Sequence, residues 1–120
     1  INLTRTTSSA NGIALAVSSG DTEISDSVIT ISGGTASTAV FNAGNLLMNN
    51  CTINTVDSGS GAMAILTSGT AEIKNTSIAT DPAAESISSS SPVSVRCEAS
   101  YADTDVGADV TVIGSLTIIP

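Results

Sequence analysis

Three stretches of this chain repeat one six-residue pattern at almost equal spacing along the sequence. Each stretch begins with an aliphatic residue, has Asp or Asn two positions later, continues with two small residues and ends on Ile. A unit this short cannot bury a hydrophobic face on its own, so neighbouring units have to stack and share one core. The stretches that carry the pattern are Ile24–Ile29, Met48–Ile53 and Ile73–Ile78.

Other residues recur at the same spacing and extend the alignment. Gly20, Gly44 and Gly69 form one column, and Asn2 falls one repeat before Asp26. Two apolar columns are predicted to point inward, each from a different sheet. The first comprises Val17, Phe41 and Leu66, and the second comprises Ile29, Ile53 and Ile78.

Within each unit the apolar residues alternate with period two, as in Ile13–Val17 and Val28–Ile31. This period is typical of strands and not of helices. Strands that stack about 4.8 Å apart build parallel sheets around one core, and parallel crossovers are overwhelmingly right-handed. The sequence therefore predicts an all-β fold. We expect a right-handed single-stranded parallel β-helix (β-solenoid) with three sheets and roughly five turns of 22–25 residues.

After residue 80 the repeat is looser. Val93–Val95 and Leu116–Ile118 fit the next two turns, whereas residues 81–91 contain Pro82 and a run of four serines. We predict that residues 81–91 form a loop that leaves the solenoid, and that residues 1–120 make a single domain. Because the chain starts without Met and ends inside an expected strand, we expect it to be a fragment or processed segment.

The pattern aliphatic-x-Asn-(Ser/Thr/Cys)-(Ser/Thr)-Ile resembles the repeats of right-handed parallel β-helix proteins of the pectin-lyase-like group. Within that group it is most similar to bacterial surface adhesins and autotransporter passengers, and the resemblance covers most of residues 1–80. The resemblance implies a fold and not an activity. It also implies that Asn50 and Asn75 occupy a tight turn where Asn side chains stack, because Asn tolerates the left-handed backbone region. Asp26 interrupts a pure Asn ladder at the equivalent place.

Composition argues against several classes of function. The chain has three Lys and Arg in total and 11 Asp and Glu, which gives a formal charge of −8. Because nucleic acids and anionic membrane surfaces bind basic patches, neither is an expected partner. No apolar run is long enough for insertion into a membrane. The chain has no His, and Lys74 and Arg96, which the alignment places at equivalent positions on successive turns, are expected on a solvated face. We therefore expect no enzymatic activity and no cofactor.

One segment has the spacing of a metal-binding loop. Asp103, Asp105 and Asp109 flank Gly107, and alternating carboxylates around a Gly can converge on one Ca²⁺. The segment lacks the distal bidentate Glu of an EF-hand, and an acidic solvent loop is the competing interpretation. These three Asp residues are the candidate metal ligands of the chain.

Threonines at a regular interval raise a different possibility. Thr30, Thr55 and Thr80 are equally spaced, and flat Thr-rich solenoid faces can organise water and bind ice. The residues two positions before them include Ile53 and Ile78, which are expected in the core. We therefore do not expect an ice-binding face.

The two cysteines are predicted to remain free thiols. The alignment places Cys97 in the column of Asn50 and Asn75, with Cys51 one residue further along its own turn and two turns away. Two steps between stacked strands amount to about 9.6 Å, whereas a disulfide requires α-carbons within about 7 Å.

The leading functional hypothesis is a structural or adhesive segment of a surface-displayed β-solenoid protein, located extracellularly or at the cell surface. It would contact surface glycans or host proteins through its loops and flat faces. One alternative is a self-assembling extracellular filament or fibre subunit, whose copies join end to end through unpaired strand edges. Another is the non-catalytic part of a polysaccharide lyase or hydrolase.

Overall fold

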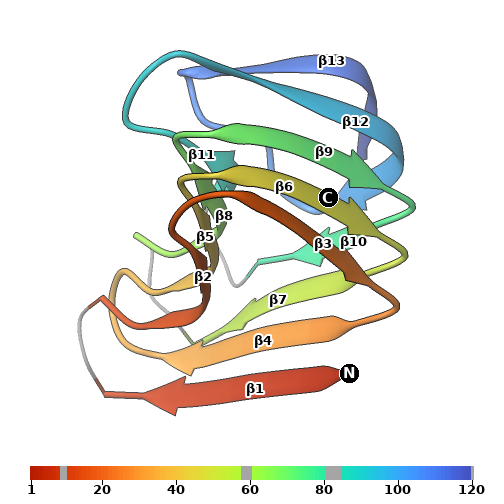
Figure 1. Ribbon diagram of the computed structural model, residues 1–120. Coiled ribbons are helices and arrows are strands. Elements are labelled where there is room, and N and C mark those ends of the chain that lie inside the picture. The colour runs from red at the N-terminus through yellow and green to blue at the C-terminus, as the bar shows by residue number, and fades with distance from the viewer. Residues whose placement is uncertain (9–10, 58–60, 81–84, 120) are drawn as a thin grey trace.

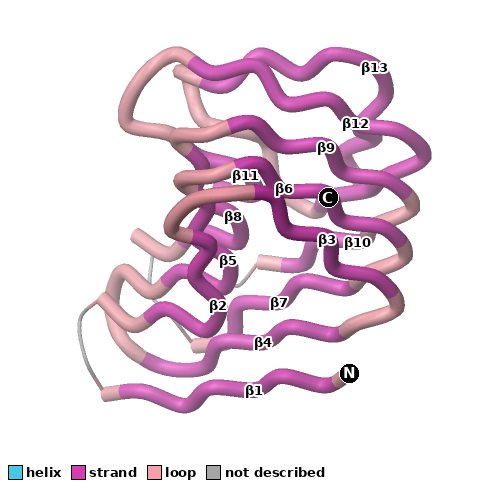
Figure 2. The backbone as a smooth tube through the Cα atoms, in the orientation of Figure 1, coloured by secondary structure: helices cyan, strands magenta, loops and turns pink. Residues whose placement is uncertain are grey.

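The computed structural model describes residues 1–8, 11–57, 61–80 and 85–119, and the described residues contain strands and turns but no helix (Figure 2). The strands follow the period-two alternation of the sequence. Their bounds are β1 Asn2–Thr7, β2 Ile13–Val17, β3 Asp21–Ser25, β4 Val28–Gly33, β5 Thr38–Asn42, β6 Asn45–Asn49, β7 Thr52–Val56, β8 Met63–Thr67, β9 Thr70–Lys74, β10 Ser77–Ala79, β11 Glu85–Ser88, β12 Val93–Ala102 and β13 Val110–Ile118.

All strand pairs are parallel, and the chain coils so that each strand stacks on one from the preceding turn (Figure 1). The first face consists of β2, β5, β8 and β11. The second face consists of β3, β6 and β9 with the first half of β12, and the third consists of β1, β4, β7 and β10 with its second half. β13 pairs with both halves of β12. The predicted parallel β-solenoid is therefore confirmed, but its three faces form two hydrogen-bonded sheets and not three, because β12 continues from the second face into the third.

The solenoid has about four turns, as the four strands of the first face indicate, and not the predicted five. The difference arises at the C-terminal end, where the last turn is shorter than those before it and residues 103–109, between β12 and β13, form no strand on the first face. Val93 pairs with Val110 and Tyr101 pairs with Thr117. Leu116 accordingly stacks on Ser100 and not on Val93. The sequence alignment assumes that every turn is about as long as the first three, which is not the case here.

The loop predicted over residues 81–91 is wrong for its central part, which contains strand β11. Ile87 stacks on Ile65 of β8 and is fully buried. Its serine neighbours are also buried, and Ser86 Oγ donates to the carbonyl oxygen of Asp105 at 3.1 Å. A serine-rich segment can therefore form a strand because its hydroxyls find partners inside the fold. Residues 81–84 of the predicted loop lie outside the described residues.

The core is built from stacked aliphatic columns. Ile29, Ile53 and Ile78 lie in register on β4, β7 and β10, with 2%, 0% and 3% of their surface exposed. This column was predicted, and it is confirmed.

The other predicted column is wrong by one residue. Phe41 and Leu66 face outward and are half-buried, whereas Val17 points inward and stacks with Asn42 and Thr67. A buried Asn is tolerated here because its amide is fully used. Its Nδ2 donates to Thr67 Oγ1 at 3.0 Å and to the carbonyl of Thr70 at 2.9 Å, and its Oδ1 accepts from the amide of Gly44 at 3.0 Å. Polar residues therefore occupy a core column that the apolar pattern does not reveal.

A tight bend between the second and third faces recurs in successive turns of the solenoid. Asp26, Asn50 and Asn75 have φ of 54°, 56° and 49°, so the predicted left-handed turn is confirmed, and Ala99 takes the same conformation on the next turn with φ 47°. Asn50 Nδ2 donates to Asp26 Oδ1 at 2.7 Å, so Asp takes part in the ladder as an acceptor. Asn2 does not belong to this column, because it pairs with Val28 inside the sheet.

The residue after each left-handed position points inward and is small. Its hydroxyl or thiol donates to the carbonyl two residues earlier, so this inward polar group has a hydrogen-bond partner. The distances are 2.8 Å for Ser27, 3.5 Å for Cys51, 2.8 Å for Thr76 and 3.0 Å for Ser100. This column explains why Ser, Thr and Cys follow the Asp or Asn of the repeat.

Candidate functional site

The outer surface of the third face carries no charged side chain among the described residues. Of the charged residues that the structure describes, only Arg5 lies on one of its strands, and there it occupies the inward column and donates to the carbonyl of Ile13. We call this surface the neutral face. Its outward residues are Asn2, Thr4, Thr6, Val28, Thr30, Ser32, Thr52, Asn54, Val56, Ser77, Ala79, Tyr101 and Thr117.

The neutral face is a regular array of short side chains. Thr4, Thr30 and Asn54 are neighbours across three strands, and Asn54 Nδ2 donates to Thr30 Oγ1 at 3.3 Å. Tyr101 stands at one side of the array, beside Ser77, with 48% of its surface exposed. Stacked strands set the rows about 4.8 Å apart. The arrangement presents hydroxyl, amide and methyl groups on a flat surface.

The threonine column predicted from the sequence is wrong. Thr30 pairs with Asn54, because the step from β4 to β7 is one residue shorter than the spacing of the threonines. Thr55 points inward, stacks on Ile31 and is 3% exposed. The neutral face was therefore missed. Shortening the alignment by one residue between β4 and β7, and then searching the aligned strands for columns without charged residues, would have found the neutral face.

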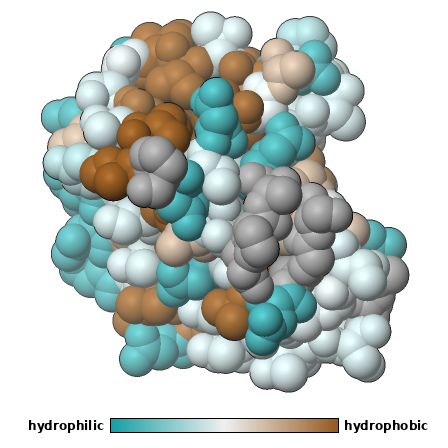
Figure 3. Space-filling model, turned by 180° about the vertical axis from the view of Figure 1, so that it is seen from behind, coloured by the Kyte–Doolittle hydropathy of each residue, from teal (hydrophilic) through white to brown (hydrophobic). Residues whose placement is uncertain are grey.

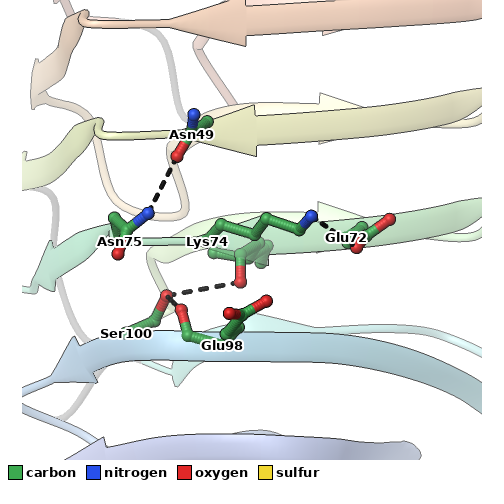
Figure 4. Close-up of polar contacts among 7 residues, drawn as sticks. Asn49, Glu72, Lys74, Asn75, Glu98 and Ser100 are labelled. Atoms are coloured by element: carbon green, nitrogen blue, oxygen red, sulfur yellow. Dashed lines mark hydrogen bonds and ion pairs between the residues drawn. The ribbon is translucent and has the colours of Figure 1, made fainter.

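The outer surface of the second face is charged. Glu72 pairs with Arg96, and Lys74 pairs with Glu98 on the same two strands, β9 and β12. Lys74 and Arg96 are therefore not at equivalent positions, contrary to the alignment, and each lies opposite a carboxylate. Lys74 Nζ also contacts Glu72 Oε1 at 3.2 Å (Figure 4). Exposed pairs of this kind contribute little to stability.

A shallow groove of about 690 Å³ crosses this charged surface. Its lining includes the acidic residues Asp21, Glu23 and Glu72, the cation Arg96 and the apolar side chain of Ile113. Asp21 accepts a hydrogen bond from Asn45 Nδ2 at 2.7 Å. The groove thus combines both signs of charge, in contrast to the neutral face.

The three Asp residues predicted as calcium ligands are not gathered into one site. Asp103 accepts from the amide and the hydroxyl of Thr80 at 2.9 and 3.0 Å, and Asp105 Oδ1 accepts from the amide of Val106 at 2.8 Å. Among the described residues there is no group of three or more His, Cys, Asp or Glu that could hold a metal ion. The amide of Gly107 bonds to the carbonyl of Ile87 of β11 at 2.8 Å, so this segment lies alongside that strand.

Both cysteines are free and buried, as predicted. Cys51 lies in the small inward column of the tight turn, whereas Cys97 stacks on Ile73 and not on Asn75. The predicted position of Cys97 was therefore wrong by two residues, although the prediction of free thiols holds. Burial raises the pKa of the Cys97 thiol from 9.0 to about 11.

This pKa shift predicts a loss of stability at alkaline pH. The unfolded thiol loses its proton near its ordinary pKa, but the folded thiol keeps it to about pH 11. The contribution of the protonated thiol to stability is therefore complete below about pH 9. As the pH rises from about 9 to about 11, the free energy of unfolding falls by up to about 2 kcal/mol. Urea unfolding from about pH 8 to about pH 11 should reveal the decline in the wild type and a flatter profile in Cys97→Val. Equal slopes in the two proteins would contradict the assignment.

Hydrophobic side chains gather over the C-terminal turns when the molecule is viewed from behind (Figure 3). Ile113 and Ile118 of β13 are 43% and 37% exposed, and Ile119 beyond it is 56% exposed. None of these residues belongs to the neutral face.

Comparisons with protein-family models, with curated proteins and with solved structures found no match to this chain. Within the part of the chain that the structure describes, no helix is long and apolar enough to cross a membrane.

Proposed function

We propose that this chain is a structural and adhesive segment of a surface-displayed β-solenoid protein and that it contacts its target through the neutral face. The observation that carries the proposal is the distribution of charge. The chain has 14 charged residues, several of them on the outer surface of the second face, yet the described outward positions of the third face hold none.

Charges are excluded from a surface for a physical reason. A charged side chain that loses its water without gaining a partner is strongly unfavourable, whereas hydroxyls and amides can exchange water for hydrogen bonds to a ligand. The neutral face can therefore be covered at low cost. Stacked strands hold its side chains in fixed rows, so little conformational entropy is lost when a partner binds.

The extracellular location and the likeness to surface adhesins belong to the same proposal. They are supported by the resemblance of the repeat to such proteins and by a composition of few charged and many hydroxyl residues. The proposal assigns no catalytic step to the chain. Its role is to hold a contact surface on a stack of strands, which can be lengthened by further turns without a change of cross-section.

The proposal is tested on a slide printed with purified neutral and acidic glycans, collagen and fibronectin. The fluorescently labelled chain should be retained on at least one of these probes. Thr30→Lys, which places a cation in the middle of the neutral face, should remove that retention. Ser94→Lys adds the same charge on the second face, where Ser94 is exposed, and should leave retention unchanged. Absence of retention on every probe, or equal retention of Thr30→Lys, would contradict the proposal.

A further inference from the structure

We infer that the neutral face binds neutral glycans, with the ring of Tyr101 as the platform for one sugar unit. This inference rests on the proposed function and specifies the class of ligand. It follows from the charge, the size and the chemical groups of the face, and from the exposed position of its aromatic side chain.

Charge selects against ionic ligands. An acidic glycan would approach a protein of net charge −8 and would find no cation among the residues of the neutral face. A basic ligand would be drawn to the carboxylates of the second face, such as Glu23 and Glu72 beside the groove. An uncharged ligand is neither repelled by the negative charge of the protein nor drawn to the carboxylates of the second face, and its polar groups need only hydrogen bonds.

Size selects against a stable protein partner. The six strands that contribute to the neutral face span about 24 Å, and the longest of them, β1 and β4, have six residues or about 20 Å, so the face covers at most about 500 Å². A stable protein interface buries about 800 Å² on each partner. A ribbon-shaped polymer fits this area better, since it can lie along one row of side chains and continue onto further turns.

The groups on the face match the hydroxyls of a sugar chain. A Thr or Ser hydroxyl both donates and accepts a hydrogen bond, and an Asn amide does so through two different atoms. Thr30 and Asn54 are already joined at 3.3 Å, which holds both side chains in place for a ligand. Sugar hydroxyls, which also donate and accept, can bond to either one.

Tyr101 supplies the apolar contact that a sugar ring needs. It pairs with Ser77 on one side and with Thr117 on the other, and 48% of its surface is exposed. A large exposed ring between two hydroxyl residues offers a flat apolar surface for the C–H face of a pyranose and a phenolic oxygen for its hydroxyls.

The chain contains one Tyr and no Trp, so its tyrosine fluorescence reports on this position alone. We propose to titrate the protein with soluble hexasaccharides of β-1,4-linked glucose and of β-1,4-linked N-acetylglucosamine, with the hexamer of galacturonic acid as the acidic comparison. At least one neutral sugar should change the emission of Tyr101 in a saturable manner. The acidic sugar should leave it unchanged.

Variants locate the binding site. Thr30→Lys should weaken the affinity for the neutral sugar by at least about tenfold, because its ammonium group would be covered without a counter-charge. Thr4→Lys, at the edge strand β1, is the second variant, with the same expectation should Thr30→Lys fail to give native circular dichroism. Ser94→Lys is the matched control and should retain the wild-type affinity.

Three results would overturn the inference: no response of Tyr101 to either neutral sugar, an equal response to the acidic sugar, or unaltered affinity in both neutral-face variants. These failures are distinguishable from failure of the adhesive function. Retention on collagen or fibronectin that Thr30→Lys removes would preserve the function while excluding glycans as its ligand.

Discussion

Replacing Ile53 by Ala is expected to lower the free energy of unfolding by about 2–5 kcal/mol. Ile53 is fully buried between Ile29 and Ile78 in the stack of the third face. Truncation removes apolar contacts with both neighbours and leaves a cavity that rigidly spaced strands cannot close. The change is measured by urea unfolding at neutral pH.

The matched control for this prediction is Thr52→Ala. Thr52 precedes Ile53 on the same strand but faces outward on the neutral face, so its truncation should change stability by less than about 0.5 kcal/mol. Thr55 is unsuitable as a control, since it also points inward and is 3% exposed. Similar losses at Ile53 and Thr52 would mean that the inward and outward assignments of β7 are wrong.

Replacing Gly44 by Val is expected to lower the free energy of unfolding by about 3 kcal/mol, near the upper end of the range for overpacking. A β-carbon at Gly44 would lie 2.6 Å from the carbonyl oxygen of Gly20 and 2.9 Å from the carbonyl carbon of Ser19. Both are backbone atoms of the preceding turn. Because they cannot rotate away, the two turns have to separate, which weakens the hydrogen bond from the amide of Asn45 to Gly20.

The control for Gly44 is the residue before it. Ala43 is exposed in the same turn, so Ala43→Val enlarges a side chain that has room and should change stability by less than about 0.5 kcal/mol. Thermal unfolding of the two variants gives the comparison. A loss at Ala43→Val as large as that at Gly44→Val would contradict the close approach of the turns.

The repeat predicted the stacking of the turns because some positions allow few residue types. The left-handed turn favours Asp or Asn at positions such as 26, 50 and 75, and the column after it favours a small hydrogen-bonding residue. The column of Ile29, Ile53 and Ile78 follows at a fixed distance from that turn. Residues close to the turn could therefore be aligned correctly from the sequence alone.

The alignment failed where turn length varies by one residue. Gly20 comes three positions after Val17, but Gly44 comes only two positions after Asn42, so an alignment on the glycines shifts the first face by one position. A shift of one residue exchanges the inward and outward sides of a strand. Apolar character could not correct the shift, because Phe41 faces outward while Asn42 is buried with its hydrogen bonds satisfied.

The neutral face was missed for a related reason. Aligning Thr30 with Thr55 placed a buried residue on the surface, and the true neighbour, Asn54, was overlooked. The calcium loop predicted from Asp103, Asp105 and Asp109 is a separate case. The spacing of these three residues suggested convergence, but the segment lies beside β11, where Asp103 bonds to Thr80 and Asp105 bonds to the amide of Val106. Sequence spacing does not show whether the carboxylates of such a segment point toward one another.

Successive turns stack in parallel with the register of Ile29, Ile53 and Ile78. Methyl-labelled isoleucine NMR tests it directly, with Ile53→Val used to assign the middle resonance. This register predicts nuclear Overhauser contacts from the Ile53 δ-methyl to those of Ile29 and Ile78, which lie one step of about 4.8 Å away on either side. It predicts no direct contact between Ile29 and Ile78, which are about 9.6 Å apart. Absence of the Ile53 contacts, or a strong contact between Ile29 and Ile78, would contradict the stack.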